Sequence, residues 1–229
     1  SSGYMDLIAL GVPMWFTASG IISEFVFGLV TLLIAFFSYR VYKLTHQRYT
    51  GLFTLAFASI SAAYFIQAAL NLFIILGVNS SDVVGVIAPA IRHNVFPLSV
   101  IAVMLHMALL IGGFAILSYV TLKESNPRIF ILLVVLAAVG LLTTNALILT
   151  FYLMSSMFLL FITLQHYSRH KKSGTVSSLL IYFGFALIFL GNFQLAMSFF
   201  IGTFYILGHL TTLIGYFLLL ASLLRVVRR

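Results

Sequence analysis

Cysteine is absent from all 229 residues of the chain, and only 7% of the residues are charged. The absence of cysteine excludes disulfide scaffolds, thiolate metal sites, iron–sulfur ligation and cysteine nucleophiles. The scarcity of charge excludes a soluble globular domain, in which about 25% of residues are charged. Acidic residues are rarer than basic ones: the four are Asp6, Glu24, Asp82 and Glu124. Their separate locations exclude the paired carboxylates of a glycosidase.

Apolar residues take the place of the missing charge. They make up 62% of the chain, and the mean hydropathy is +1.18. The polar residues that remain could not cover a water-soluble core of this composition. The sequence therefore predicts an all-α, multi-pass protein of the cell (plasma) membrane, with the lipid bilayer as its main partner.

Seven segments are long and apolar enough to be expected to cross about 30 Å of hydrocarbon, which takes about 20 residues. They are residues 19–42, 50–78, 97–122, 129–142, 146–166, 176–201 and 203–224. We expect one seven-helix bundle over residues 1–229, with 1–4 as an expression remnant, 5–17 as an interfacial segment and 79–96 as the long outer loop. The four prolines, Pro13, Pro89, Pro97 and Pro127, are expected in loops or at helix starts.

Basic residues set the expected orientation, because cytoplasmic loops accumulate Lys and Arg. Eleven of the twelve fall after the first, third, fifth and seventh segments, on one side of the membrane: Arg40, Lys43, Arg48, Lys123, Arg128, Arg169, Lys171, Lys172, Arg225, Arg228 and Arg229. The exception is Arg92. The N-terminus is therefore predicted outside and the C-terminus inside. Placement in short clusters between apolar runs also argues against a nucleic-acid partner.

Three ionisable residues, Glu24, His106 and His209, lie within predicted spans, where burial of such groups is costly and points to function. Counted from the basic residue that ends each helix, all three lie about 24–26 Å from the inner boundary, at about 1.5 Å per residue. They therefore share one level in the outer half of the membrane.

Further polar side chains cluster near this level and complete the predicted ligand site. They are Tyr64, Gln67, Asn71, Arg92, Asn192, Tyr205 and Thr212. The pattern indicates an outward-facing polar pocket lined by the first, second, third, sixth and seventh helices. Two glycine pairs, Gly184 with Gly191 and Gly208 with Gly215, are expected to let neighbouring helices approach closely.

Several interpretations of this layer are open. A mostly apolar pocket with a few convergent polar groups is the usual form of a small-molecule site. Glu24, His106 and His209 also have the chemistry of a transition-metal site, and the two histidines could ligate a haem. The plainest alternative is that each imidazole makes one interhelical hydrogen bond and that Glu24 is a neutral acid or pairs with Arg92 or His209.

The layout resembles that of two families of membrane hydrolases, the alkaline ceramidases and the adiponectin receptors. The resemblance rests on seven helices and on histidines in the third and seventh, His106 and His209. It implies a metal-dependent lipid hydrolase, although Leu213 stands where those families have a second histidine on the last helix. The segments 39–45 and 53–57 resemble those of uncharacterised archaeal seven-helix membrane proteins, which implies no residue roles.

The ligand-binding interpretation requires the fewest assumptions. We therefore expect a sensor, receptor or transport-related bundle that binds a small or lipid-like ligand. The short inner loops leave no room for a catalytic domain, so signalling would need a separate partner in a complex. Retinal binding through a Schiff base is excluded, because residues 203–224 contain no lysine.

Overall fold

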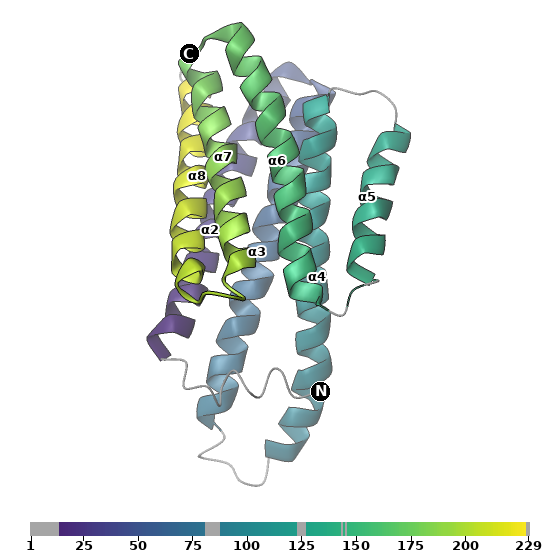
Figure 1. Ribbon diagram of the computed structural model, residues 1–229, viewed down its shortest axis with the longest axis vertical. Coiled ribbons are helices and arrows are strands. Elements are labelled where there is room, and N and C mark those ends of the chain that lie inside the picture. Colours follow the sequence, from purple (N-terminus) through teal and green to yellow (C-terminus); the bar gives the residue numbers. More distant parts are fainter. Residues whose placement is uncertain (1–13, 81–87, 123–126, 143, 145, 228–229) are drawn as a thin grey trace.

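Every regular element that the structure describes is an α-helix (Figure 1). This computed structural model describes residues 14–80, 88–122, 127–142, 144 and 146–227; within these ranges, the side chains of 14–19, 74–80, 88–99, 127, 129, 142 and 226–227 are left out. The helices are α2 (Met14–Thr45), α3 (Arg48–Ser80), α4 (Ala88–Leu122), α5 (Pro127–Leu142), α6 (Leu147–Ser173), α7 (Val176–Met197) and α8 (Thr203–Val227). The all-α prediction is confirmed.

Six of these helices close into a ring. Helix α2 packs on α3, α3 on α4, α4 on α6, α6 on α7, α7 on α8, and α8 returns to α2. Helix α5 lies outside this ring and contacts only α4 and α6 among the described elements (Figure 1). The interior of the bundle is therefore built by six helices.

The six ring helices are also the ones that are long and apolar enough to cross a membrane. The chain is thus a multi-pass helical membrane protein. Helix α5 has 16 residues, of which Phe130–Leu141 form its apolar part. At about 1.5 Å per residue it is about 24 Å long, shorter than a hydrocarbon core of about 30 Å. A seventh crossing at 129–142 stays a prediction.

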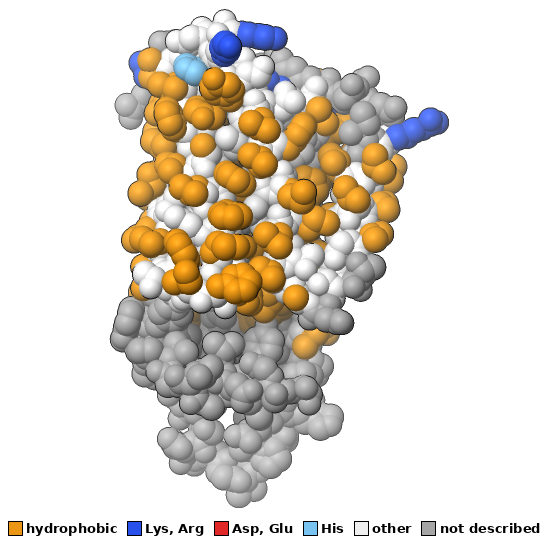
Figure 2. All heavy atoms as spheres, in the orientation of Figure 1, with side chains coloured by type: hydrophobic (Ala, Val, Ile, Leu, Met, Phe, Trp, Pro, Cys, Tyr) orange, Lys and Arg blue, Asp and Glu red, His pale blue; other side chains and the backbone are white. Residues whose placement is uncertain are grey.

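The outer surface of the ring is apolar, as contact with lipid requires. Large side chains such as Phe36, Phe73 and Met157 are half or more exposed. Figure 2 shows such side chains spread over the helices, with Lys and Arg gathered at the end of the bundle that carries the C-terminus. This charge asymmetry agrees with the predicted orientation, which itself stays a prediction.

The connection before α4 differs from the prediction. Helix α3 continues to Ser80 and α4 begins at Ala88, so most of the segment 79–96 is helical rather than a loop. Pro97 therefore lies inside α4 and not at its start. The true start signal is Pro89, which sits in the first turn, where a missing N–H costs least. Transmembrane helices tolerate an interior proline because neighbouring groups satisfy the freed carbonyl.

The other predicted boundaries agree more closely with the helices. The sixth predicted span, 176–201, ends earlier, at Met197. Residues 1–13, which include the expected remnant, Pro13 and most of the interfacial segment, lie outside the described residues, as do 81–87. Helix α6 ends at Ser173 and is capped by Gly174, whose φ of +62° suits glycine. Thr175 then caps α7 by accepting a hydrogen bond from the N–H of Ser178.

Helices α7 and α8 approach each other through glycine, as the sequence predicts. A Cβ atom added to Gly215 would lie 2.7 Å from the carbonyl oxygen of Gly184, and one added to Gly191 would lie 2.7 Å from that of Gly208. The two backbones therefore touch at two levels. This contact brings the cavity-facing side of α8 close to α7.

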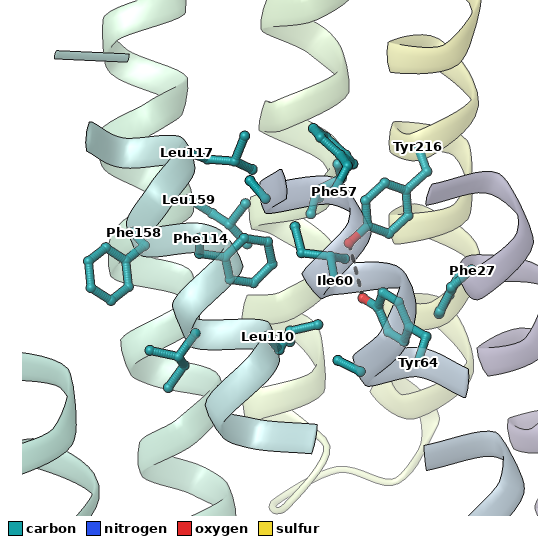
Figure 3. Close-up of a cluster of buried hydrophobic side chains, with 14 of the residues drawn as sticks. Phe27, Phe57, Ile60, Tyr64, Leu110, Phe114, Leu117, Phe158, Leu159 and Tyr216 are labelled. Carbon is teal, nitrogen blue, oxygen red and sulfur yellow. Dashed lines mark hydrogen bonds between the residues drawn. The ribbon is translucent and has the colours of Figure 1, made fainter. Parts of the chain in front are cut away.

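Large apolar side chains fill the interior of the ring in the half nearer the basic residues. Those labelled in Figure 3 include Phe57, Ile60, Phe114, Leu117 and Leu159, each exposed by 1% or less. The cluster joins α3, α4 and α6. Towards the end away from the basic residues, below this packed layer in Figure 1, polar side chains line the interior.

Candidate functional site

A cavity of about 100 Å³ lies inside the ring, and all six ring helices contribute to its wall. Its polar lining side chains are Glu24 from α2, Tyr64 and Gln67 from α3, His106 from α4, Tyr152 from α6, Asn192 from α7, and His209 and Thr212 from α8. A volume of this size holds several water molecules or a small ligand, since about 10–15 Å³ suffices for one water.

Seven of the ten predicted site residues therefore line one cavity. Two others adjoin it: Asn71 contacts Glu24, and Tyr205 contacts His209. Arg92 belongs to the first part of α4, but its side chain lies outside the described part of the structure. The helices bring the predicted set together from sequence positions up to 188 residues apart, as from Glu24 to Thr212. A ligand-binding role for these residues remains a prediction.

Glu24 is held from the neighbouring helix. Its Oε2 atom accepts a hydrogen bond of 2.7 Å from Nδ2 of Asn71, and the residue is 9% exposed. Glu24 shares a buried face of α2 with Thr31 and Ser38, at seven-residue steps that the helix period aligns. This face turns into the ring, which explains why an acid survives in an otherwise apolar span.

Both cavity histidines are oriented by backbone carbonyl groups. Nδ1 of His106 lies 2.8 Å from the oxygen of Ala63 on α3, and Nδ1 of His209 lies 2.9 Å from the oxygen of Tyr205, one turn earlier on α8. A carbonyl oxygen can only accept, so each Nδ1–H donates. In the neutral imidazole the Nε2 atom is then left as a hydrogen-bond acceptor.

Aromatic rings separate the two histidines. The ring of His106 packs on that of Tyr64 at 6.3 Å, Tyr64 packs on Phe27 at 5.1 Å, and Phe27 stacks on His209 at 5.6 Å. The hydroxyl groups of Tyr64 and Tyr216 lie 3.1 Å apart and share a hydrogen bond (Figure 3). These rings form the apolar wall between the polar groups.

Two buried oxygen atoms in the cavity wall have no hydrogen-bond partner among the described residues. They are Oε1 of Gln67 and Oγ1 of Thr212. Thr212 is 1% exposed and packs against Gly191, which has no side chain to offer it a hydrogen bond. Both oxygens are enclosed by protein atoms, that of Thr212 by the backbone of Gly191, so they are buried acceptors beside the cavity and do not face its open space.

A metal centre does not fit the described residues. No group of three His, Asp or Glu side chains among them is arranged to hold a metal ion, including the predicted set of Glu24, His106 and His209. A haem does not fit either. Its macrocycle would need the space that Tyr64 and Phe27 fill between the imidazoles, and the remaining volume is well below the roughly 300–1,000 Å³ of drug-sized sites.

The contribution of α6 to the cavity was not predicted. This helix was predicted as the span 146–166 and was not among those expected to line the pocket, yet Ile148, Phe151 and Tyr152 do so. Helix α6 carries no acidic, basic or histidine residue at this level, so a search for costly charged groups could not find it. The signal that was present is aromatic: Phe151 packs on His106 with ring centres 5.8 Å apart.

Comparisons with protein-family models, with curated proteins and with solved structures find no match to this chain. The site is therefore interpreted from its own chemistry.

Proposed function

We propose that the chain is an integral protein of the cell membrane that binds a small or lipid-like ligand in a pocket open to the outer side, as a sensor, a receptor or part of a transport process. One observation supports this above the others: polar side chains from all six ring helices converge on a single cavity. If each polar residue were simply tolerated in its own span, the polar residues would not be expected to meet at one cavity.

The size and lining of the cavity refine the proposal. A few polar groups against rings such as Phe27 and Phe151 match the usual make-up of a small-molecule site. The volume of about 100 Å³ suits a small molecule or the polar end of a larger, lipid-like one. No observation favours the hydrolase or the haem alternative, because the described residues offer no metal centre.

Cysteine labelling tests whether the cavity opens to water. The chain has no cysteine of its own, so only the introduced thiol can react. In the near-isosteric variant Val103→Cys, the thiol lines the cavity on α4. The matched control is Ser61→Cys, because Ser61 is 2% exposed, bonds the carbonyl oxygen of Gly28 and does not line the cavity. A membrane-impermeant thiol reagent added outside intact cells should label the first variant and not the second.

Two results would contradict the proposal. If the Val103→Cys thiol stays unlabelled in cells and in detergent, the cavity is closed to aqueous ligands. If both variants label equally, labelling reports general loosening of the bundle and not a pocket.

A further inference from the structure

The cavity combines one acidic side chain with an excess of hydrogen-bond acceptors. We propose that its ligand is a small organic ammonium ion, a primary amine of a few carbon atoms in its protonated form. The inference rests on the proposed function and names the chemical class of the ligand for the same site. Three features of the wall lead to it: charge, hydrogen-bonding capacity and aromatic lining.

Charge comes first. Glu24 is an acid in the cavity wall, and none of the described residues that line the cavity is a lysine or an arginine. Asn71, which bonds Glu24 from α3, donates a neutral amide N–H. An ionised carboxylate inside a bilayer is costly unless it is paired. A cationic guest would supply the missing opposite charge, whereas an anionic guest would meet repulsion.

The hydrogen-bonding capacity of the wall points the same way. The carboxylate of Glu24 can only accept when it is ionised. The Nε2 atoms of His106 and His209 are acceptors in their neutral forms, because each Nδ1–H is already used. An alkylammonium group brings three N–H donors and no acceptor, as a lysine head group does.

The aromatic lining favours an organic cation over a metal ion. The rings of Phe27, Tyr64 and Phe151 line the cavity, and ammonium groups are attracted to aromatic rings. A volume of about 100 Å³ exceeds the needs of a bare metal ion and accommodates a short alkyl chain. The described residues also offer no metal centre.

The test uses ethylammonium chloride with the purified protein in lipid nanodiscs. Isothermal titration calorimetry measures its binding at ionic strength held constant with potassium chloride. Two size-matched comparators, potassium acetate and ethanol, and sodium chloride as a metal-cation control are measured alongside. Ethylammonium should bind saturably with one site per chain, and acetate and ethanol should not. In a second readout, ethylammonium should protect the Val103→Cys thiol from labelling in a background that keeps every polar group of the site.

Variants assign the binding to the named groups. Glu24→Gln keeps the shape of the side chain and an oxygen for Asn71 but removes the charge, and it should weaken ethylammonium binding by about tenfold or more. The matched control is Ser61→Ala, which removes a buried hydroxyl outside the cavity and should leave the affinity unchanged.

Several outcomes would overturn the inference. Equal binding or protection by acetate or ethanol would show that charge does not select the ligand, and equal protection by sodium chloride would make the occupant a metal cation. Unchanged affinity in Glu24→Gln would remove the counter-charge argument. If that variant fails to fold, the protection experiment decides alone. If another class of molecule protects the thiol and ethylammonium does not, the ammonium inference is wrong and the proposed function stands. If no reagent reaches the Val103→Cys thiol, both are wrong.

Discussion

The hydroxyl groups of Tyr64 and Tyr216 meet at 3.1 Å across the interior of the bundle, although 152 positions separate the two residues in the sequence. Tyr64 belongs to α3 and Tyr216 to α8, which are not neighbours in the ring of helices. The ring of Phe27 packs on both tyrosines, at 5.1 and 5.9 Å (Figure 3). This link lies directly beside the cavity and joins two of the helices that supply its polar groups.

Removal of one hydroxyl from this pair should destabilise the bundle. Tyr216→Phe keeps the ring contacts but leaves the buried hydroxyl of Tyr64 without its partner, at a cost of about 0.6–1.7 kcal/mol, the range of such bonds in a bilayer. Unfolding by sodium dodecyl sulfate in mixed micelles measures the change. Tyr167→Phe, at a half-exposed position, is the matched control and should change the free energy of unfolding little. Equal losses of unfolding free energy in both variants would mean that the buried hydrogen bond stabilises the bundle no more than an exposed hydroxyl does.

Two adjacent glycines on α4 should respond in opposite ways to alanine. A Cβ atom on Gly113 would lie 2.6 Å from Cγ1 of Ile60 and 3.0 Å from the carbonyl oxygen of Ala56, whereas one on Gly112 meets nothing within 4 Å. Gly113→Ala should push α4 away from α3 and cost about 1–3 kcal/mol. Gly112→Ala should be neutral or stabilising by up to about 1 kcal/mol, through helix propensity. Thermal unfolding of the two variants checks this, and a similar loss in both would contradict the assigned faces.

The sequence predicts the helices well because, in a bilayer, hydropathy and helix length are linked by membrane thickness. The start of α4 was missed because two prolines, Pro89 and Pro97, offered the same start signal and composition could not choose between them. The position of α5 outside the ring could not be predicted either. It depends on how the neighbouring helices pack, and an apolar segment has no polar side to reveal which way it faces.

The site was predictable to the extent that it is polar. Glu24, His106 and His209 were singled out because each is costly in lipid, and equal depth along three helices suggested that they converge. The contributions of Ile148, Phe151 and Tyr152 were invisible, since aromatic and aliphatic side chains are equally at home in lipid and in a cavity. The choice between a metal and a metal-free site needed the side-chain positions of Glu24, His106 and His209, which are not arranged to hold a metal ion.

The predicted orientation of the chain can be tested at the two ends of α7. Ser173 lies at the end of α6, in the basic connection to α7, and the exposed Gly202 lies in the connection from α7 to α8, at the other end of α7. In intact cells an impermeant thiol reagent should label Gly202→Cys and spare Ser173→Cys until the membrane is permeabilised. The reverse pattern would place the N-terminus inside and would turn the cavity towards the cytoplasm.

Helix α5 should open more readily than its neighbours. Among its described side chains only Ala137 is fully buried, whereas α6 buries seven, including Phe151, Leu159 and Ile162. Local opening costs less where less apolar contact is lost, so amide hydrogen exchange in detergent micelles should be at least about tenfold faster in α5 than in α6, a factor that corresponds to about 1.4 kcal/mol. Helix α6 serves as the internal control because it packs against α5 in the same sample. Equal protection would show that α5 is held as firmly as the ring, which would favour a full seventh crossing at residues 129–142.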